Sequence, residues 1–389
     1  MTVIITDAKY RMTLAAIREL SKEGFFVAAT TDDGEPALPL AFSSNCVGAR
    51  HVLESARYAE SLLELCEHYR RRDGDRPILL PFGARTTALI ASDARFRDAA
   101  WTHVPDQATL ELLGDKSRVL SLAAELGIPV PEQIVCRDGE TVESLAARVP
   151  YPAVIKYRNG EALGIKAAGR YRIVKNSAQF QKYYPAFAAR DPGTLIQRYI
   201  EGDGYGVSVL MKGGEVYSYI CHRRLREYPI GGGPSTLART VYDKTLHAQA
   251  VRLLRAAGLE GVAMVEFKGS PETGYTLMEV NPRIWGTFPL TYAAGCRFAT
   301  AWAETALGIA EPLDELTIPY EVSKRMQFSV SDLMAALSWL KAGHIGPLFS
   351  AVGCFFNPRV SGGIFTWDDP KPAFVYLRAI LHRRKEQGI

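Results

Sequence analysis

The chain has 389 residues, of which 47% are hydrophobic and 23% charged, a composition that excludes collagen-like, coiled-coil and disordered proteins. At about 150 residues per domain, this length predicts two or three domains. A formal net charge of +4 without a block of Lys and Arg argues against a dedicated nucleic-acid binder. The six cysteines are far apart and do not cluster with the seven histidines, so we expect no zinc or iron–sulfur site.

Neither end of the sequence has a pattern typical of membrane insertion. Residues 1–14 lack the basic start and apolar stretch of a signal peptide. Residues 342–358 are uncharged, but glycines and a proline interrupt them, which disfavours a membrane-spanning helix. The basic tail, residues 378–385, is more typical of a solvated helix face than of a membrane contact. We therefore expect a cytoplasmic protein without a membrane span.

The first 105 residues or so alternate between strand and helix patterns. This alternation predicts an open, parallel α/β sheet with ligand-facing loops at its strand ends. No G-x-G-x-x-G follows the first strand, which argues against a dinucleotide site there. In the loop 81–87, Arg85 is a candidate contact to a second substrate, and Thr86 and Thr87 are equally well explained as a helix cap. The predicted elements are strands at 3–5, 25–29, 47–52 and 77–80, and helices at 11–23 and 58–71.

From residue 106 the pattern changes to one dominated by antiparallel strand pairs. A helix over 112–126 ends at Gly127, and a second helix is predicted over 178–189. Residues from 312 onward are predicted to be mixed helix and loop, with a structural turn at 367–370 before the last helix. The predicted strands are 151–156, 194–200, 206–211 with 215–221, and 263–267 with 275–280.

The most informative segment is residues 262–286, VAMVEFKGSPETGYTLMEVNPRIWG. Glu266 and Glu279 lie in two apolar runs joined by a polar turn, so in a β-hairpin the two carboxylates can face each other. A carboxylate inside an apolar strand is costly unless it is paired or binds a cation. Asn281 and Arg283 follow at intervals of two residues, on the same face of an extended chain. Glu, Glu and Asn supply oxygen ligands of the kind that Mg²⁺ takes, and the arginine is placed to hold a phosphate beside the metal.

This arrangement, E-x12-E-x-N-P-R, resembles the metal-binding end of the ATP-grasp superfamily of carboxylate–amine ligases, in particular the grasp domains of carbamoyl phosphate synthase and biotin carboxylase. The resemblance extends over residues 106–310. It implies that Lys116 and Lys156 bind the nucleotide phosphates. Lys156 would do so from the end of the strand 151–156. It also implies that the loop containing Asn159, Gly160 and Gly164 covers the phosphates as a lid.

Residues 197–200, QRYI, resemble the hinge between the two halves of the ATP-grasp fold. The resemblance implies that Gln197, Tyr199 and Ile200 line the adenine site, with backbone groups near Ile200 reading the adenine edge. The family often has Glu at the position of Gln197. This difference affects the side-chain contact to the adenine and leaves the backbone contact unchanged. Either Glu201 or Asp203 is expected to accept the ribose hydroxyls, and the sequence leaves this choice open.

A basic segment, HRRLREYP, follows the strand that is expected to cross the nucleotide cleft. Alternation places His222, Arg224 and Arg226 on one face of the strand. A guanidinium fork suits a substrate carboxylate or its acyl phosphate, and the glycines at 231–233 allow backbone amides to approach an anion. We therefore expect Arg224 and Arg226 to contact substrate or phosphate. The alternative is a solvated basic strand with a flexible loop.

Together, these patterns predict an α/β protein with three parts. An N-terminal open α/β domain of the pre-ATP-grasp type spans residues 1–105, and a two-lobed α+β ATP-grasp domain with the nucleotide and metal site spans 106–310. A small mixed extension spans 311–389. The resemblance implies ATP and Mg²⁺ as cofactors, with Mn²⁺ as an alternative metal, and a monomer or homodimer.

The implied reaction activates a carboxylate as an acyl phosphate and joins it to an amine, with release of ADP and phosphate. The implied partners are a small-molecule carboxylate and an amine. One alternative is a bicarbonate-using carboxylase or carbamoyl-phosphate-type enzyme. The sequence has no biotinyl domain, no second grasp half and no glutamine-hydrolysing Cys/His unit, which argues against it. The other alternative is a non-catalytic ATP-binding regulatory module, against which the complete set of acidic and basic residues argues.

Overall fold

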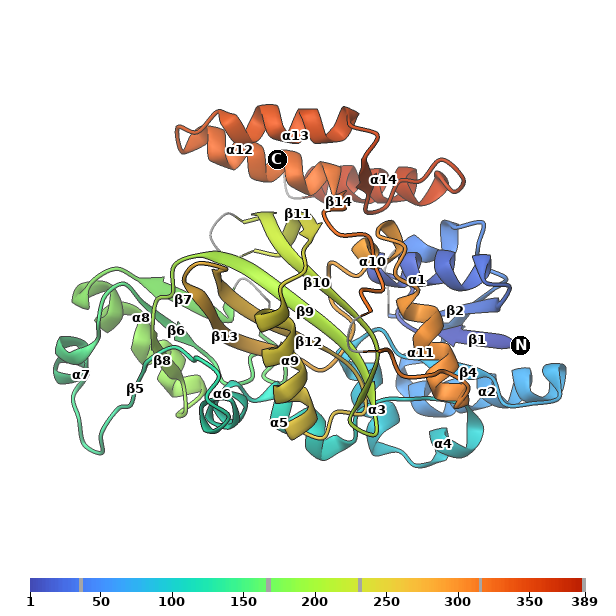
Figure 1. Cartoon of the computed structure of the whole chain (residues 1–389), viewed down its shortest axis with the longest axis horizontal. Coiled ribbons are helices and arrows are strands. Elements are labelled where there is room, and N and C mark those ends of the chain that lie inside the picture. Colours follow the sequence, from blue (N-terminus) through green and yellow to red (C-terminus); the bar gives the residue numbers. More distant parts are fainter. Residues whose placement is uncertain (35–37, 166–168, 230–232, 315–316, 387–389) are drawn as a thin grey trace.

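The computed structural model describes residues 1–34, 38–165, 169–229, 233–314 and 317–386. Its strands form three sheets (Figure 1). The N-terminal sheet lies at one end of the molecule, a small antiparallel sheet lies at the other, and a large sheet connects them. Of the three C-terminal helices, the first packs on the large sheet and the last packs against the N-terminal layer.

The N-terminal sheet is parallel, in the order β3-β2-β1-β4, which confirms the predicted alternation of strands and helices. Thr86 and Thr87 lie in the first turn of helix α3 rather than in a loop. Their hydroxyls bond Asp7 Oδ2 and the Gly83 carbonyl, at 3.0 and 2.9 Å. The elements are β1 (Thr2–Ile5), α1 (Arg11–Lys22), β2 (Phe26–Asp32), β3 (Ala49–Leu53), α2 (Tyr58–Asp73), β4 (Ile78–Leu80), α3 (Ala84–Ser92) and α4 (Arg95–Ala99), with 3₁₀ turns at Leu40–Ser43 and Ser55–Arg57.

The helix predicted over 112–126 is in fact two helices, α5 (Gln107–Gly114) and α6 (Lys116–Glu125). The break occurs at Asp115, whose carboxylate accepts hydrogen bonds from the backbone amides of Ser117 and Arg118. This is N-cap geometry, which starts a new helix and satisfies amides that have no partner inside it. The prediction was wrong here because the apolar periodicity continues across the cap.

The small lobe consists of an antiparallel sheet in the order β5-β8-β6-β7 and two helices. It has a core of its own, in which Phe180, Ile155 and Leu145 are fully buried. The strands are β5 (Gln133–Ile134), β6 (Ala153–Lys156), β7 (Tyr171–Val174) and β8 (Leu195–Arg198), and the helices are α7 (Val142–Arg148) and α8 (Ser177–Arg190).

The large sheet has the order β13-β12-β9-β10-β11-β14-β15. The two predicted strand pairs are present, but the strand predicted to end at residue 221 continues to Glu227. The strands are β9 (Asp203–Lys212), β10 (Glu215–Glu227), β11 (Ser235–Thr240), β12 (Gly261–Ser270), β13 (Gly274–Asn281), β14 (Arg325–Gln327) and β15 (Val360–Gly362). Helices α9 (Lys244–Ala256), α10 (Pro289–Ala293) and α11 (Phe298–Leu307) pack around it.

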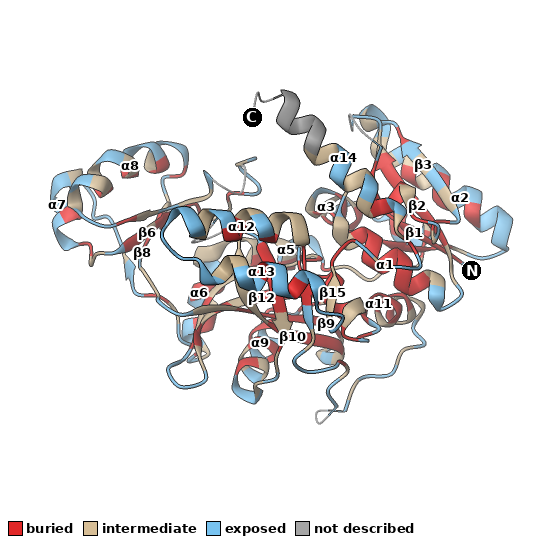
Figure 2. Cartoon of the chain, turned by 90° about the horizontal axis from the view of Figure 1, so that it is seen from above, coloured by how far each residue is buried: buried red, intermediate tan, exposed pale blue. Residues whose placement is uncertain are grey.

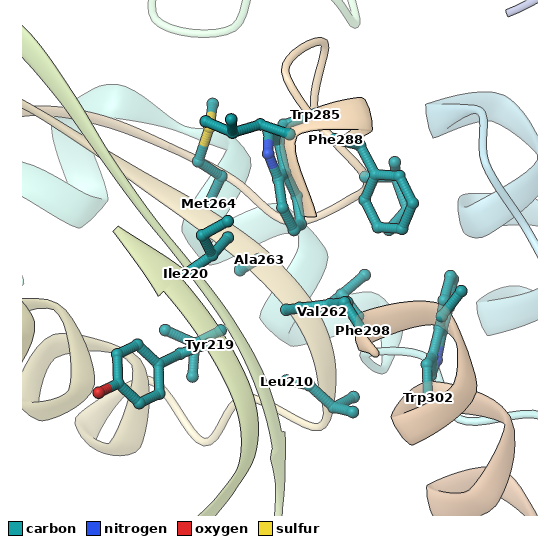
Figure 3. Packing of buried hydrophobic residues seen from close by; sticks show 14 of the residues in the cluster. Leu210, Tyr219, Ile220, Val262, Ala263, Met264, Trp285, Phe288, Phe298 and Trp302 are labelled. Carbon is teal, nitrogen blue, oxygen red and sulfur yellow. The ribbon is translucent and has the colours of Figure 1, made fainter. Parts of the chain in front are cut away.

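One apolar core joins the large sheet to the N-terminal sheet. Figure 3 shows Trp285, Phe288, Phe298 and Trp302 beside strand residues such as Val262. The same cluster includes buried residues of β1 and α1. The large sheet therefore packs against the N-terminal layer through a shared core. The predicted domain boundaries near residues 105 and 310 stay a prediction.

The C-terminal segment contains helices α12 (Ser329–Lys341), α13 (Gly346–Phe356) and α14 (Lys371–Glu386). Its strands β14 and β15 extend the large sheet at one edge. The sequence predicted only helix and loop here, because strands of three residues show no clear periodicity. The turn before α14 is structural, as predicted, since buried Asp369 accepts hydrogen bonds from Arg18 and Ser44 of the N-terminal layer. None of the helices among the described residues is long and apolar enough to cross a membrane.

Candidate functional site

A row of paired residues crosses the large sheet and forms the base of the site. Glu279 of β13 pairs with Glu266 of β12, Glu266 pairs with Gly206 of β9, and Gly206 pairs with His222 of β10. Directly paired antiparallel residues have side chains on the same face, so both carboxylates and the imidazole share one face of the sheet. The prediction that the two carboxylates meet across the hairpin is confirmed.

Glycines on β9 leave the space that these side chains occupy. A Cβ atom at Gly206 would lie 2.3 Å from the His222 ring, and one at Gly204 would lie 3.1 Å from Arg224 Cδ. Because β9 has no side chain at these positions, Arg224 reaches over it and its Nη2 lies 2.5 Å from Glu266 Oε2. The buried His222 ring lies with its Nε2 3.1 Å from the Thr287 hydroxyl. Burial lowers the pKa of His222 to about 3, so its ring is neutral.

The pKa values of the two carboxylates shift in opposite directions. Burial raises the pKa of Glu266, although Arg224 opposes this effect. Burial acts in the same direction on Glu279, but the charges of Lys116 and Lys156 outweigh it and lower its pKa to about 2. Asn281 donates from Nδ2 to Glu266 Oε1 at 3.1 Å, so the predicted metal ligands form one contiguous group.

The two predicted phosphate-binding lysines converge on this group from different elements. Lys116 is the first residue of α6, and its Nζ lies 3.0 Å from Glu279 Oε2. Lys156 ends β6, is 7% exposed, and donates from Nζ to the Met278 carbonyl at 3.2 Å. Burial lowers the pKa of Lys156 to about 8, against the opposing attraction of Glu279. One cation from α6 and one from the small lobe therefore lie beside the carboxylates of the large sheet.

Comparisons with known proteins show which proteins this chain resembles. A family profile described as "ATP-grasp in the biosynthetic pathway with Ter operon" matches residues 190–328. Biotin carboxylase 1 of Bacillus subtilis (strain 168) is 25% identical over 297 residues, which are 72% of this chain and 63% of that protein. The chain thus spans less than two thirds of the length of this relative. The family match over residues 190–328 and the similarity to biotin carboxylase 1 support the resemblance to the ATP-grasp superfamily.

Solved structures confirm the predicted α/β fold class. The biotin carboxylase domain of Hydrogenobacter thermophilus 2-oxoglutarate carboxylase, in complex with MgADP, ADP and bicarbonate, has a TM-score of 0.63 at 15% identity, covering 83% of this chain and 73% of that chain. The L-amino acid ligase of Bacillus licheniformis has a TM-score of 0.55 at 14% identity, covering 80% and 75%. At these identities the likeness concerns the ATP-grasp fold alone.

The predicted adenine end of the ATP-grasp cleft contains a buried amide with no partner. Gln197 on β8 is 1% exposed, and neither its Oε1 nor its Nε2 has a hydrogen-bond partner among the described residues. A buried amide without partners is costly, and a ligand with donors and acceptors would satisfy it. Beyond β8, Lys268 Nζ lies 3.2 Å from the Ile200 carbonyl and 4.7 Å from the ring centroid of Tyr199. The residues present therefore fit a nucleobase.

The two ribose candidates are in different positions. Asp203 forms an ion pair with Arg223 of β10, whereas the side chain of Glu201 is exposed. The sequence left the choice between them open. The structure adds that a ribose contact by Asp203 would compete with Arg223, while Glu201 has no such ion pair among the described residues.

The arginines predicted to contact substrate are separated. Arg283 Nη2 lies 3.0 Å from Glu161 Oε2, next to Gly160 in the predicted lid, and residues 166–168 of that lid lie outside the described residues. Arg226 forms an ion pair with Asp332 of α12 at 2.6 Å. The expected alternation from Arg224 to Arg226 is wrong, because a register shift lies between them. The adjoining glycines at 231 and 232 also lie outside the described residues.

The sequence gave no signal for two further residues, Tyr171 and Arg11. Tyr171 of β7 pairs in register with Lys156, and nearby Glu227 and Arg224 influence its pKa, which burial raises. The guanidinium of Arg11 lies 3.4 Å above the Phe328 ring, next to the loop at Gly286, and among the described residues no carboxylate pairs with it. Burial lowers the pKa of Arg11 to about 10. Arg11 is far from the motif in sequence, so only the fold could reveal it.

Proposed function

We propose that this ATP-grasp protein is an ATP- and Mg²⁺-dependent ligase that activates a carboxylate as an acyl phosphate and joins it to an amine, releasing ADP and phosphate. One observation carries the proposal. Lys116 and Lys156, suited to a polyphosphate, lie against Glu266, Glu279 and Asn281, which are suited to a divalent cation. Among the described residues no group of three His, Cys, Asp or Glu is placed to hold a metal, so the amide and phosphate oxygens are needed to complete the coordination.

In this proposal each residue has a defined task. Lys116 and Lys156 bind the phosphates, and Gln197, Tyr199 and Ile200 line the nucleobase site. Glu266, Glu279 and Asn281 would hold Mg²⁺, which when bound supplies neutralisation of the charge that develops in phosphoryl transfer. The two phosphate-binding lysines and the three proposed metal ligands come from the small lobe, α6 and the large sheet. They can therefore act together only when these three parts are packed against one another.

The remaining arginines are assigned to the substrate end of the cleft. Arg283 binds oxygens of the transferred phosphoryl group and of the acyl phosphate, and Arg224 orients Glu266 and contacts the same anion. Arg226 is retained as a weaker candidate for this contact because it is already paired with Asp332. The lid that contains Gly160 and Glu161 excludes water, since an exposed acyl phosphate would hydrolyse. Arg11 lies beside Gly286, three residues after Arg283, and has no carboxylate partner among the described residues, so it is assigned to a further carboxylate of the substrates.

The experiment is a panel of carboxylates crossed with amines, including amino acids as both partners, with ATP and Mg²⁺. We expect release of ADP and phosphate with an active pair, and none from the Glu279→Ala variant. Glu272→Ala is the matched control, because Glu272 is exposed in the turn of the same hairpin. Release of AMP and pyrophosphate would contradict the acyl-phosphate mechanism.

A bicarbonate-using enzyme is the second candidate, and the similarity to biotin carboxylase 1 is what favours it. Adding bicarbonate as the carboxylate in the same panel separates the two. ADP release that requires bicarbonate and no other carboxylate would favour this candidate. Tight ATP binding without ADP formation across the whole panel would instead favour the non-catalytic module.

A further inference from the structure

The C-terminal helices carry an exposed apolar surface, which we call the C-terminal face. It consists of the exposed apolar residues of α12 and α13 and the aromatic residues before and within α14. Figure 1 shows where these helices lie, and Figure 2 shows their exposed residues in pale blue. Several large side chains here are more exposed than buried, namely Ile345, Phe349 (70%), Phe355 (62%), Phe356 (76%), Trp367 (91%) and Phe374 (62%). A group of large exposed apolar side chains in one part of the chain is typical of an interaction site.

Helix α13 has its apolar side turned outward. Its inward contacts are made by small residues, Ala351 and Cys354, while the phenylalanines face away from the protein. No residue from 342 to 358 carries a charge. A surface helix of a water-soluble protein normally has the reverse arrangement, with polar residues outward. The outward face of α13 is therefore built to contact something other than water.

Most charged residues around the C-terminal face are positive; an exception is exposed Asp368, whose carboxylate lies 3.3 Å from Lys22 Nζ. There is no Asp or Glu between residues 333 and 367. Exposed Lys341 and Arg359 flank α13, and exposed Lys371 and Arg378 lie on α14. The acid of α12, Asp332, is fully buried in its pair with Arg226. An apolar surface with a cationic rim complements a surface that is apolar inside and anionic at its edge.

We propose that the C-terminal face binds the surface of an anionic phospholipid bilayer. The aromatic side chains enter the boundary between headgroups and acyl chains, and the cations contact the anionic headgroups. The contact is peripheral, because none of the described helices could span a bilayer. A second copy of the chain fits less well, since pairing the same face with itself would bring like charges together.

The C-terminal face is attached directly to the candidate site. Asp332 and Ser350 hold the guanidinium of Arg226 near the end of β10, two residues from Arg224. Helix α12 also packs against β10 and β11. A bilayer bound to this face would therefore lie beside the β10 end of the cleft. The inference does not rest on the proposed reaction, because membrane binding and ADP release are measured separately.

The experiment is sedimentation of the full chain with vesicles. We expect binding to vesicles of phosphatidylcholine with about 30% phosphatidylglycerol, and little binding to phosphatidylcholine alone. The variant Phe349→Ser/Phe355→Ser/Phe356→Ser should lower the partition coefficient by about 100-fold. The control variant Val52→Ser/Val135→Ser/Ile309→Ser removes equally exposed apolar residues elsewhere and should bind as the unmodified chain does.

Two further measurements make the result decisive. Lys341→Glu/Arg359→Glu should weaken binding to the anionic vesicles, and Trp367 fluorescence should shift to shorter wavelength when they are added. Equal binding by the triple-phenylalanine variant, or no binding to anionic vesicles, would overturn the proposal. A dimer in light scattering that the triple variant abolishes, without vesicle binding, would assign the face to a second copy instead.

Discussion

Replacing Lys156 with Met should stabilise the nucleotide-free protein while weakening nucleotide binding. The ammonium group is buried, and within the part of the chain that the structure describes it donates one hydrogen bond, to the Met278 carbonyl. Burial lowers its pKa from 10.5 to about 8 even though Glu279 and Glu266 attract it. Since each unit of pKa corresponds to about 1.4 kcal/mol, keeping this charge inside the folded protein costs about 3 kcal/mol.

The pH dependence of this effect has a definite direction. Below pH 8 the lysine is charged in both the folded and unfolded states, and the folded state bears the whole cost. Between pH 8 and 10.5 the unfolded state binds more protons, so the stability of the unmodified protein rises with pH. Lys156→Met should therefore be more stable by up to about 3 kcal/mol at pH 7, and this advantage should vanish as the pH approaches 10.5.

The assay is chemical denaturation of both proteins at several pH values, with calorimetric titration of ADP and Mg²⁺ at pH 7. We expect the variant to unfold at higher denaturant concentration and to bind ADP at least about tenfold more weakly, because a charged contact to phosphate is lost. A variant that is less stable at pH 7 yet binds ADP normally would refute both the burial argument and the phosphate assignment.

Three further predictions concern other parts of the cleft. Gln197→Leu should weaken ADP binding about tenfold in calorimetry without lowering stability, because the buried amide has no hydrogen-bond partner to lose among the described residues. Gly206→Ala should destabilise the protein by about 2 kcal/mol or more in denaturation, because its Cβ would overlap the neighbouring histidine ring; Gly353→Ala, with no atom within 4 Å, should not. Arg11→Met should raise the KM for the substrate that carries the further carboxylate by about tenfold and leave the KM for ATP unchanged; an unchanged substrate KM would exclude Arg11 from the substrate site.

The elements with strong periodicity were predictable from the sequence. The N-terminal crossovers and the β12–β13 hairpin follow from apolar patterning, since each strand is long enough to show its alternation. The break at Asp115 and the short strands β14 and β15 were not predictable. A helix cap acts through one side chain within a continuous apolar pattern, and β15 pairs with β14 across more than thirty intervening residues.

The residues of the candidate site likewise fall into those that the sequence predicted and those that it did not. Glu266, Glu279 and Asn281 are close in sequence, so the geometry of a hairpin brings them together and the motif is readable. Arg226 was expected beside Arg224, but a bulge turns it toward Asp332, and no pattern in the sequence marks that bulge. Contacts such as these depend on packing between distant segments, which local propensity does not encode.

Two acidic residues of the candidate site are already paired with two basic ones. Glu279 pairs with Lys116, Glu266 with Arg224, and each pair joins a proposed metal ligand to a proposed ligand of phosphate or substrate. A divalent cation alone would leave the basic groups without partners, and a polyphosphate alone would leave the acids without partners, which is costly at low exposure. A metal–nucleotide complex carries both signs of charge. The two glutamates could then pair with the metal, and Lys116 and Arg224 with phosphate oxygens. The charge pairing therefore favours binding of nucleotide and metal together over binding of either one alone.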